Sequence, residues 1–169
     1  MTPMLESDEL PRRAMSESCA FMQYLCDRYG LERFYPADPE RRAMLDSAMF
    51  YLTGTLYPLV ARATYPALGF ADCPGEIGAS DASPQEKEKG RKAAEDAIAE
   101  PLEVIRSFYL DGGNFLGGAE PSIADMRFAA TLEFLRAIDA LGRAYMEPAV
   151  DVRGYIQFVT QQRRSSRNS

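Results

Sequence analysis

Histidine is absent from this 169-residue sequence. The chain therefore lacks the commonest general base and the commonest metal ligand, which excludes Ser-His or Cys-His hydrolysis and a histidine-ligated zinc site. We expect no metal site. Cysteine is also scarce, since Cys19, Cys26 and Cys73 form no CxxC pair. Because Cys19 and Cys26 share one apolar helical segment, we expect buried free thiols in a reducing compartment rather than disulfides.

Long apolar runs and an excess of basic charge are missing too. No run of about 18 apolar residues is present, and the start "MTPMLESDEL" has neither a basic region nor the hydrophobic stretch of a signal peptide. The formal net charge of −6 opposes binding to a phosphate backbone. The basic cluster "QQRRSSRNS" lacks apolar residues, so 163–169 is expected to be a flexible tail. We therefore expect a cytoplasmic protein that binds neither membranes nor nucleic acid.

Apolar residues at helical spacing dominate what is present. They make up 46% of the chain, enough for an ordinary hydrophobic core. No convincing strand appears beyond the first dozen residues, and the predicted fold class is all-α, a helical bundle. The predicted helices cover 19–29 with Gly30 as the end signal, 39–65 with a bend at Pro58, 84–110 with a kink at Pro101, 122–141, 141–146 and 152–162. A long loop is predicted over 66–84.

Two pairs of polar residues stand at predicted helix starts. Ser122 and Asp125, in "SIADM", predict an N-terminal capping box, and with no histidine available a catalytic Ser-Asp pair is not expected. Replacing either with alanine should cost roughly 1 kcal/mol, and more if the helix start is buried. Glu17 and Ser18, in "MSESCAFMQYL", allow two readings. They are either a serine cap with an acidic neighbour or a helix start that binds a ligand.

Four segments, in this order, resemble the cytosolic glutathione transferases, most closely the delta, epsilon, theta and bacterial-type members. They are "ESCAFMQYL", "FYPADPERRAMLDSAMFYLTGTLYP", "FLGGAEPSIADM" and "RGYIQFV". Together they span about Pro3 to about Val159. The segment that combines "FLGG" with the capping box is the most specific of the four.

The resemblance implies a domain organisation. Residues 1–34 would be a partial thioredoxin-like, glutathione-binding domain, consisting of its third and fourth strands and third helix, and 35–162 would be the all-helical C-terminal domain. The chain would be truncated at its N-terminus relative to the family. The Ser, Tyr or Cys that activates the glutathione thiol would then lie upstream, so no catalytic residue is assigned.

The resemblance also implies a glutathione site. Ser18 would receive a glutathione carboxylate, Glu17 would pair with its amino group, and Thr2 would give a backbone contact beside Pro3, the family's cis-proline. Two features depart from the pattern. Cys19 stands where many delta-type members have an arginine, and Pro11 argues against a strand in "ESDELPRRAMS", because proline cannot donate to a ladder.

For the hydrophobic co-substrate, the resemblance implies a pocket lined by the second predicted helix. Phe50 and Tyr57 lie seven residues apart on it, although core packing explains them nearly as well. The implied function is conjugation of the glutathione thiol to small hydrophobic electrophiles in detoxification, with glutathione as co-substrate and no cofactor. A homodimer or a protein partner is expected. The alternative is a non-catalytic helical module for protein association or ligand holding.

Overall fold

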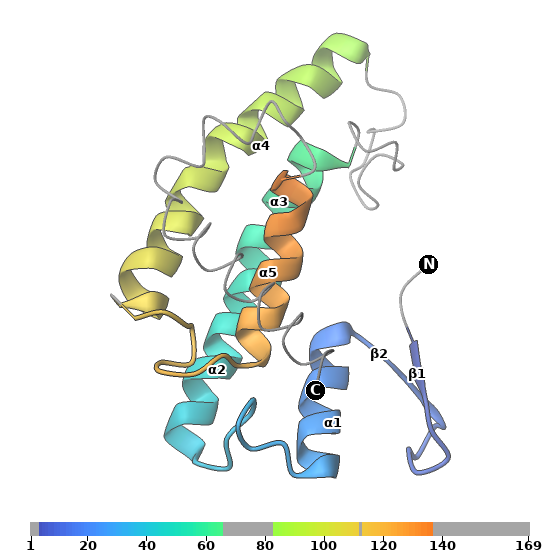
Figure 1. Ribbon diagram of the computed structural model, residues 1–169. Helices are drawn as coiled ribbons and strands as arrows, with labels where there is room; N and C mark the ends of the chain where they lie inside the picture. Colours follow the sequence, from blue (N-terminus) through green and yellow to red (C-terminus); the bar gives the residue numbers. More distant parts are fainter. Residues whose placement is uncertain (1–3, 66–82, 112, 137–169) are drawn as a thin grey trace, which may run out of the picture.

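The computed structural model of the chain describes residues 4–65, 83–111 and 113–136 (Figure 1). Within them the fold is largely helical, with a small two-stranded sheet. The largely helical fold agrees with the predicted class, and the sheet lies within residues 1–34, where the resemblance implies two strands. Several predicted features lie outside the described residues, namely Thr2, Pro3, Cys73, most of the 66–84 loop, the helices 141–146 and 152–162, and the tail 163–169.

The sheet is an antiparallel hairpin of β1 (Met4–Glu6) and β2 (Ala14–Ser16), in which Leu5 lies opposite Met15. The expectation that Pro11 prevents a strand here is wrong. Pro11 lies in the connection between the strands, where no ladder hydrogen bond is asked of its nitrogen.

Helix α1 (Ser18–Tyr29) follows the hairpin and confirms the first predicted helix. It ends at Gly30, which adopts a left-handed conformation with φ 63° and donates its N–H to the Cys26 carbonyl. Glycine tolerates this conformation without a Cβ clash, so the predicted end signal acts as expected. The Cys26 side chain is buried in the core and carries a free thiol.

The second predicted helix is present in three parts. Helix α2 (Pro39–Tyr51) begins at Asp38, whose carboxylate accepts from the Arg41 N–H at 2.9 Å. It continues as the π-helical segment η1 (Leu52–Leu56) and then as α3 (Tyr57–Thr64). The π turn directly precedes Pro58, which has no N–H to give to an α-helical ladder. The disturbance predicted at this proline therefore takes the form of a π segment.

Helix α4 (Pro84–Val104) is the long third helix, extended by the π-helical segment η2 (Ile105–Leu110). Ser83 caps it through a capping box with Glu86, and Pro101 lies inside it, four residues before η2. Helix α5 (Ile123–Arg136) comes last among the described elements.

The core lies where α2, η1 and α3 meet α4 and α5, and α1 lies between this bundle and the hairpin (Figure 1). The largest fully buried apolar side chains come from η1, α3, α4, η2 and α5: Leu52, Leu56, Val60, Ile98, Ile105, Ile123 and Phe128. None of the helices in the described ranges is long and apolar enough to cross a bilayer.

Candidate functional site

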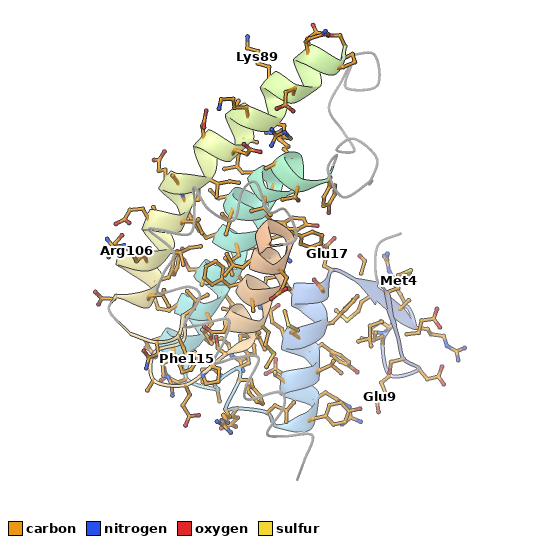
Figure 2. All side chains as sticks on the ribbon, turned by 45° about the horizontal axis from the view of Figure 1, so that its top comes forward. Met4, Glu9, Glu17, Lys89, Arg106 and Phe115 are labelled. Atoms are coloured by element: carbon orange, nitrogen blue, oxygen red, sulfur yellow. The ribbon has the colours of Figure 1, made fainter. Side chains whose placement is uncertain are left out.

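The start of α1 combines exposure with an unusual backbone. Glu17 precedes the helix with φ 74° and ψ 107°, and its side chain makes no capping hydrogen bond. A non-glycine residue at positive φ is uncommon and costs of order 1–3 kcal/mol, so such residues persist where the surroundings hold them. Glu17 and Ser18 are both exposed, and Glu17 lies at the end of α1 that faces away from Gly30 (Figure 2).

Ser18 is the first residue of the helix rather than its cap. The reading of a serine cap is therefore wrong, because Glu17 occupies the cap position. The first α-helical hydrogen bond of this turn runs from the Phe21 N–H to the Glu17 carbonyl at 3.1 Å. The N–H groups of residues 18–20 have no acceptor within the helix, as at every helix start, and the helix dipole favours an anion in front of them.

Cys19 attaches this helix start to the bundle. Its sulfur lies 3.5 Å from the Thr53 hydroxyl oxygen in η1. The Thr53 hydroxyl donates to the Met49 carbonyl at 2.8 Å, so in the Cys19 contact the thiol is the donor. Cys19 is half-buried, whereas its neighbours Glu17 and Ser18 face solvent. The expected burial of Cys19 is thus only partial.

Three polar side chains join α1, α2 and the connector between them, and we call them the polar clamp: Gln23, Tyr35 and Asp46. Asp46 accepts from the Gln23 amide at 2.6 Å and from the Tyr35 hydroxyl at 2.9 Å. Gln23 also donates to the Tyr35 oxygen at 3.2 Å. Burial and the bond to Asp46 raise the pKa of Tyr35 to about 12, so the phenol stays protonated and remains a donor.

Arg42 reinforces the clamp from α2. Its guanidinium carbon lies 4.2 Å from the centre of the Tyr35 ring, and its nitrogens donate to the Pro36 carbonyl and to Asp27, both at 2.8 Å. Asp27 belongs to α1, so the arginine also ties that helix to α2. The sequence analysis missed this group, because its members are spread over 24 residues and pair only in the folded chain. The sequence signal that could have revealed this group is the occurrence of polar residues on a helix face that otherwise packs against the core.

The two residues predicted for the hydrophobic pocket lie in different surroundings. Phe50 is 76% exposed. Tyr57 is half-buried in an aromatic cluster, which we define as Tyr57, Tyr65 and Phe134, with ring centres 6.0–6.5 Å apart. The Tyr57 and Tyr65 hydroxyls are hydrogen bonded to each other. The π-helical segment η1 lies between Phe50 and Tyr57, and a π turn holds more residues than an α turn.

The start of α5 confirms the Asp125 half of the predicted capping box, in which the acid bonds back to the Ser122 N–H. Asp125 is 1% exposed, and its carboxylate accepts from the Ser122 N–H at 2.6 Å and from the Ser122 hydroxyl. It also accepts from the Leu116 N–H at 2.7 Å, which fixes the preceding turn. A Cβ at Gly117 would lie 3.0 Å from the Ser122 Cβ and 3.2 Å from Leu45, so a larger residue in this turn would force these neighbours to shift.

Comparison with known proteins gives one consistent result. The sequence model described as "Glutathione S-transferase, C-terminal domain" matches residues 86–157. The chain is 31% identical to Anopheles gambiae glutathione S-transferase 2 over 78% of its own length and 56% of that protein's. It is 28% identical to a Drosophila melanogaster glutathione S-transferase over 73% of the chain and 50% of the relative. The chain thus spans about half the length of these curated relatives.

Solved structures agree on the fold. A Sulfitobacter glutathione transferase homologue, crystallised with bound glutathione, is 20% identical, with a TM-score of 0.65, over 89% of this chain and 65% of that one. At this identity the likeness speaks for the fold alone.

Proposed function

Because this chain belongs to the cytosolic glutathione transferase superfamily, we propose that the start of α1 binds the γ-glutamyl end of glutathione. The Ser18 hydroxyl and the first-turn N–H groups would donate to the α-carboxylate, and the Glu17 carboxylate would accept from the α-ammonium group. The observation that carries this proposal is the exposed helix start itself, with Glu17 in a strained conformation and no side-chain cap. By family resemblance, Thr2 and Pro3 would flank the same ligand.

We further propose that the protein is a glutathione transferase that joins the glutathione sulfur to small hydrophobic electrophiles, in detoxification. Binding both reactants side by side lowers the barrier by converting an encounter in solution into a reaction of oriented neighbours. Tyr57 and Phe50 are the proposed contacts of the electrophile. The residue that activates the thiol is not assigned. A cytoplasmic location and a homodimer belong to the same proposal.

Isothermal titration calorimetry of the whole chain with glutathione tests the binding step. We expect Ser18→Ala to weaken binding about 10- to 100-fold, which corresponds to the loss of one hydrogen bond to a charged group. The matched control is Ser16→Ala, since Ser16 is an exposed serine two residues away, at the end of β2. Equal affinity of the Ser18→Ala and Ser16→Ala proteins would overturn the proposed site.

Truncated ligands show which end of glutathione is bound. γ-Glutamylcysteine retains the carboxylate and the ammonium group of the γ-glutamyl end, so it should bind like glutathione. Cysteinylglycine lacks that end and should bind at least about tenfold more weakly. If cysteinylglycine bound more tightly than γ-glutamylcysteine, the other end of glutathione would lie at the start of α1.

A turnover assay separates the enzyme from the alternative function. With 1-chloro-2,4-dinitrobenzene, the glutathione sulfur bonds to the ring carbon and chloride leaves, which is followed by absorbance. Glutathione binding that depends on Ser18, without any turnover above the uncatalysed rate, would favour the non-catalytic ligand-holding module.

A further inference from the structure

Three side-chain hydrogen bonds join α1 to the segment formed by α2 and η1, at steps of four residues along α1. The pairs are Cys19–Thr53, Gln23–Asp46 and Asp27–Arg42. Residues four apart lie on one side of a helix, so the three bonds form a single line along α1. The partner numbers fall as the α1 numbers rise, so the two segments run antiparallel. The bond between Cys19 and Thr53 is therefore the one nearest the start of α1.

Thr53 is held firmly on its own side of this bond. Leu52 and Leu56, in the same segment η1, are 1% and 0% exposed and belong to the core. The Thr53 hydroxyl donates to the Met49 carbonyl at 2.8 Å, which fixes the direction of its oxygen. A hydroxyl oxygen has two lone pairs, so it still accepts from the Cys19 thiol. The Thr53 oxygen is thus a fixed acceptor that faces the start of α1.

The first turn of α1 depends on this acceptor. In the part of the chain that the structure describes, no other side-chain hydrogen bond joins residues 17–20 to the bundle. Consecutive residues of a helix point about 100° apart around its axis. The direction of the exposed Ser18 hydroxyl therefore follows the rotation that the half-buried Cys19 side chain fixes.

We propose that Thr53, acting through Cys19, is a positioning residue for glutathione at the start of α1. Thr53 holds the thiol, and the thiol fixes the rotation of the first turn. The Ser18 hydroxyl and the first-turn N–H groups then point together at the ligand carboxylate. This inference rests on the proposed function, and it assigns a residue of the bundle to the precision of a site that the bundle itself does not form.

Calorimetric titration of the full chain with glutathione tests the proposal. Thr53→Val keeps the side-chain shape and removes the hydroxyl, so it should weaken glutathione binding about 3- to 10-fold. The matched control is Thr131→Val. The Thr131 hydroxyl also donates within its own helix, to the Arg127 carbonyl at 3.1 Å, but it lies in α5. This control should change the affinity by less than about twofold.

Variants of Cys19 show whether Thr53 acts through the thiol. Cys19→Ala should weaken binding as Thr53→Val does, and the double variant should be no weaker than either single one. Cys19→Ser keeps a donor, so it should bind glutathione more tightly than Cys19→Ala, and this advantage should vanish when Thr53→Val is added. Ser18→Ala should also cost less affinity in the Thr53→Val protein, because the Ser18 hydroxyl is already misdirected there. A role in stability alone would not produce this pattern.

A measurement without ligand separates this inference from the proposed function. NMR order parameters of the N–H groups of residues 18–20 report how firmly the first turn is held. Thr53→Val should lower these order parameters, and Thr131→Val should leave them unchanged.

The possible results lead to different conclusions. The proposal is overturned if Thr53→Val binds glutathione as tightly as Thr131→Val, or if the effects of Thr53→Val and Cys19→Ala add. Failure of the unmodified protein to bind glutathione would overturn the proposed function. In that case, order parameters lowered by Thr53→Val would still support the hold of Thr53 on the first turn, and unchanged ones would overturn it. If Thr53→Val fails to fold by circular dichroism, the difference in affinity between Cys19→Ala and Cys19→Ser decides the question.

Discussion

Helix α1 begins directly after β2 and helix α5 begins after a turn, and their first turns are built in opposite ways. At α5 the carboxylate of Asp125 is buried, and it accepts from two backbone N–H groups and from the Ser122 hydroxyl. At α1 the cap residue Glu17 is exposed, makes no capping hydrogen bond and has positive φ. Both starts are expected to attract an anion, but only at α5 does an acidic side chain of the protein accept hydrogen bonds from backbone N–H groups at the helix start.

The difference indicates what each helix start is for. At the start of α5 the hydrogen-bonding groups are used within the protein, so removing them should destabilise the folded state. At the start of α1 the first-turn N–H groups are available to a ligand, and the strained backbone of Glu17 sets their orientation. A residue that matters for ligand binding should therefore matter little for stability, and the reverse should hold at α5.

The largest expected effect comes from Asp125→Ala. The change removes a buried acceptor and leaves the Leu116 and Ser122 N–H groups without their partner, which should lower the free energy of unfolding by about 2–4 kcal/mol. This is more than the roughly 1 kcal/mol expected from the sequence, because the helix start is buried. Urea denaturation followed by circular dichroism measures it.

Asp38→Ala is the control for that change, since Asp38 caps α2 with one exposed hydrogen bond of 2.9 Å. It should cost about 1 kcal/mol. Equal losses for the two aspartates would contradict the view that the α5 start is special.

The polar clamp gives the second largest effect. Tyr35→Phe keeps the ring under Arg42 and removes the hydroxyl that bonds Asp46 and Gln23, so it should lower the free energy of unfolding by about 1–2 kcal/mol. Tyr24→Phe is the matched control, because the Tyr24 hydroxyl makes only an exposed bond of 3.3 Å to Glu9. It should have almost no effect on stability. If Tyr24→Phe cost as much, the clamp would not be what holds α1 in place.

Local signals made much of the fold predictable. Gly30, Pro39 and the Ser122–Asp125 pair lie at helix ends, and each acts through neighbours within a few residues. The doubt about a strand near Pro11 was wrong, because the position of Pro11 within the hairpin depends on where the strands pair. Such long-range register cannot be read from a single stretch of sequence.

The candidate site was less predictable, for a physical reason. Glu17 and Ser18 were named from the family resemblance, yet the positive φ of Glu17 is a property of the folded backbone. A π segment lies between Phe50 and Tyr57, and Phe50 is exposed whereas Tyr57 is half-buried, which their seven-residue spacing did not indicate. Each miss concerns side chains that meet only through tertiary packing.

The strain at Glu17 leads to a smaller effect of opposite sign. Glu17→Gly removes the Cβ that makes φ 74° unfavourable, so the free energy of unfolding should rise by up to about 1 kcal/mol while glutathione binding weakens. Calorimetry measures both quantities. The control is Glu32→Gly in the exposed turn after α1, where φ is not positive, and this change should lower stability. If Glu17→Gly lowered stability as much as Glu32→Gly, the backbone of Glu17 would not be strained, and strain would not distinguish the start of α1 from that of α5.

The start of helix α4 gives the smallest expected effect. It has a capping box, as α5 does, but it is exposed like the start of α1. Glu86 accepts from the Ser83 N–H and hydroxyl, both at 2.8 Å, and these bonds hold the pKa of Glu86 below its usual value of 4.5. A carboxyl whose pKa is lowered by folding stabilises the fold above that usual value. The contribution is lost as the pH falls through the lowered pKa.

Carboxyl titration by NMR should show the low midpoint of Glu86, and Ser83→Ala should move this midpoint back toward 4.5. A midpoint unaffected by Ser83→Ala would mean that the Ser83 N–H alone lowers the pKa of Glu86 and that the hydroxyl of an exposed capping box adds nothing.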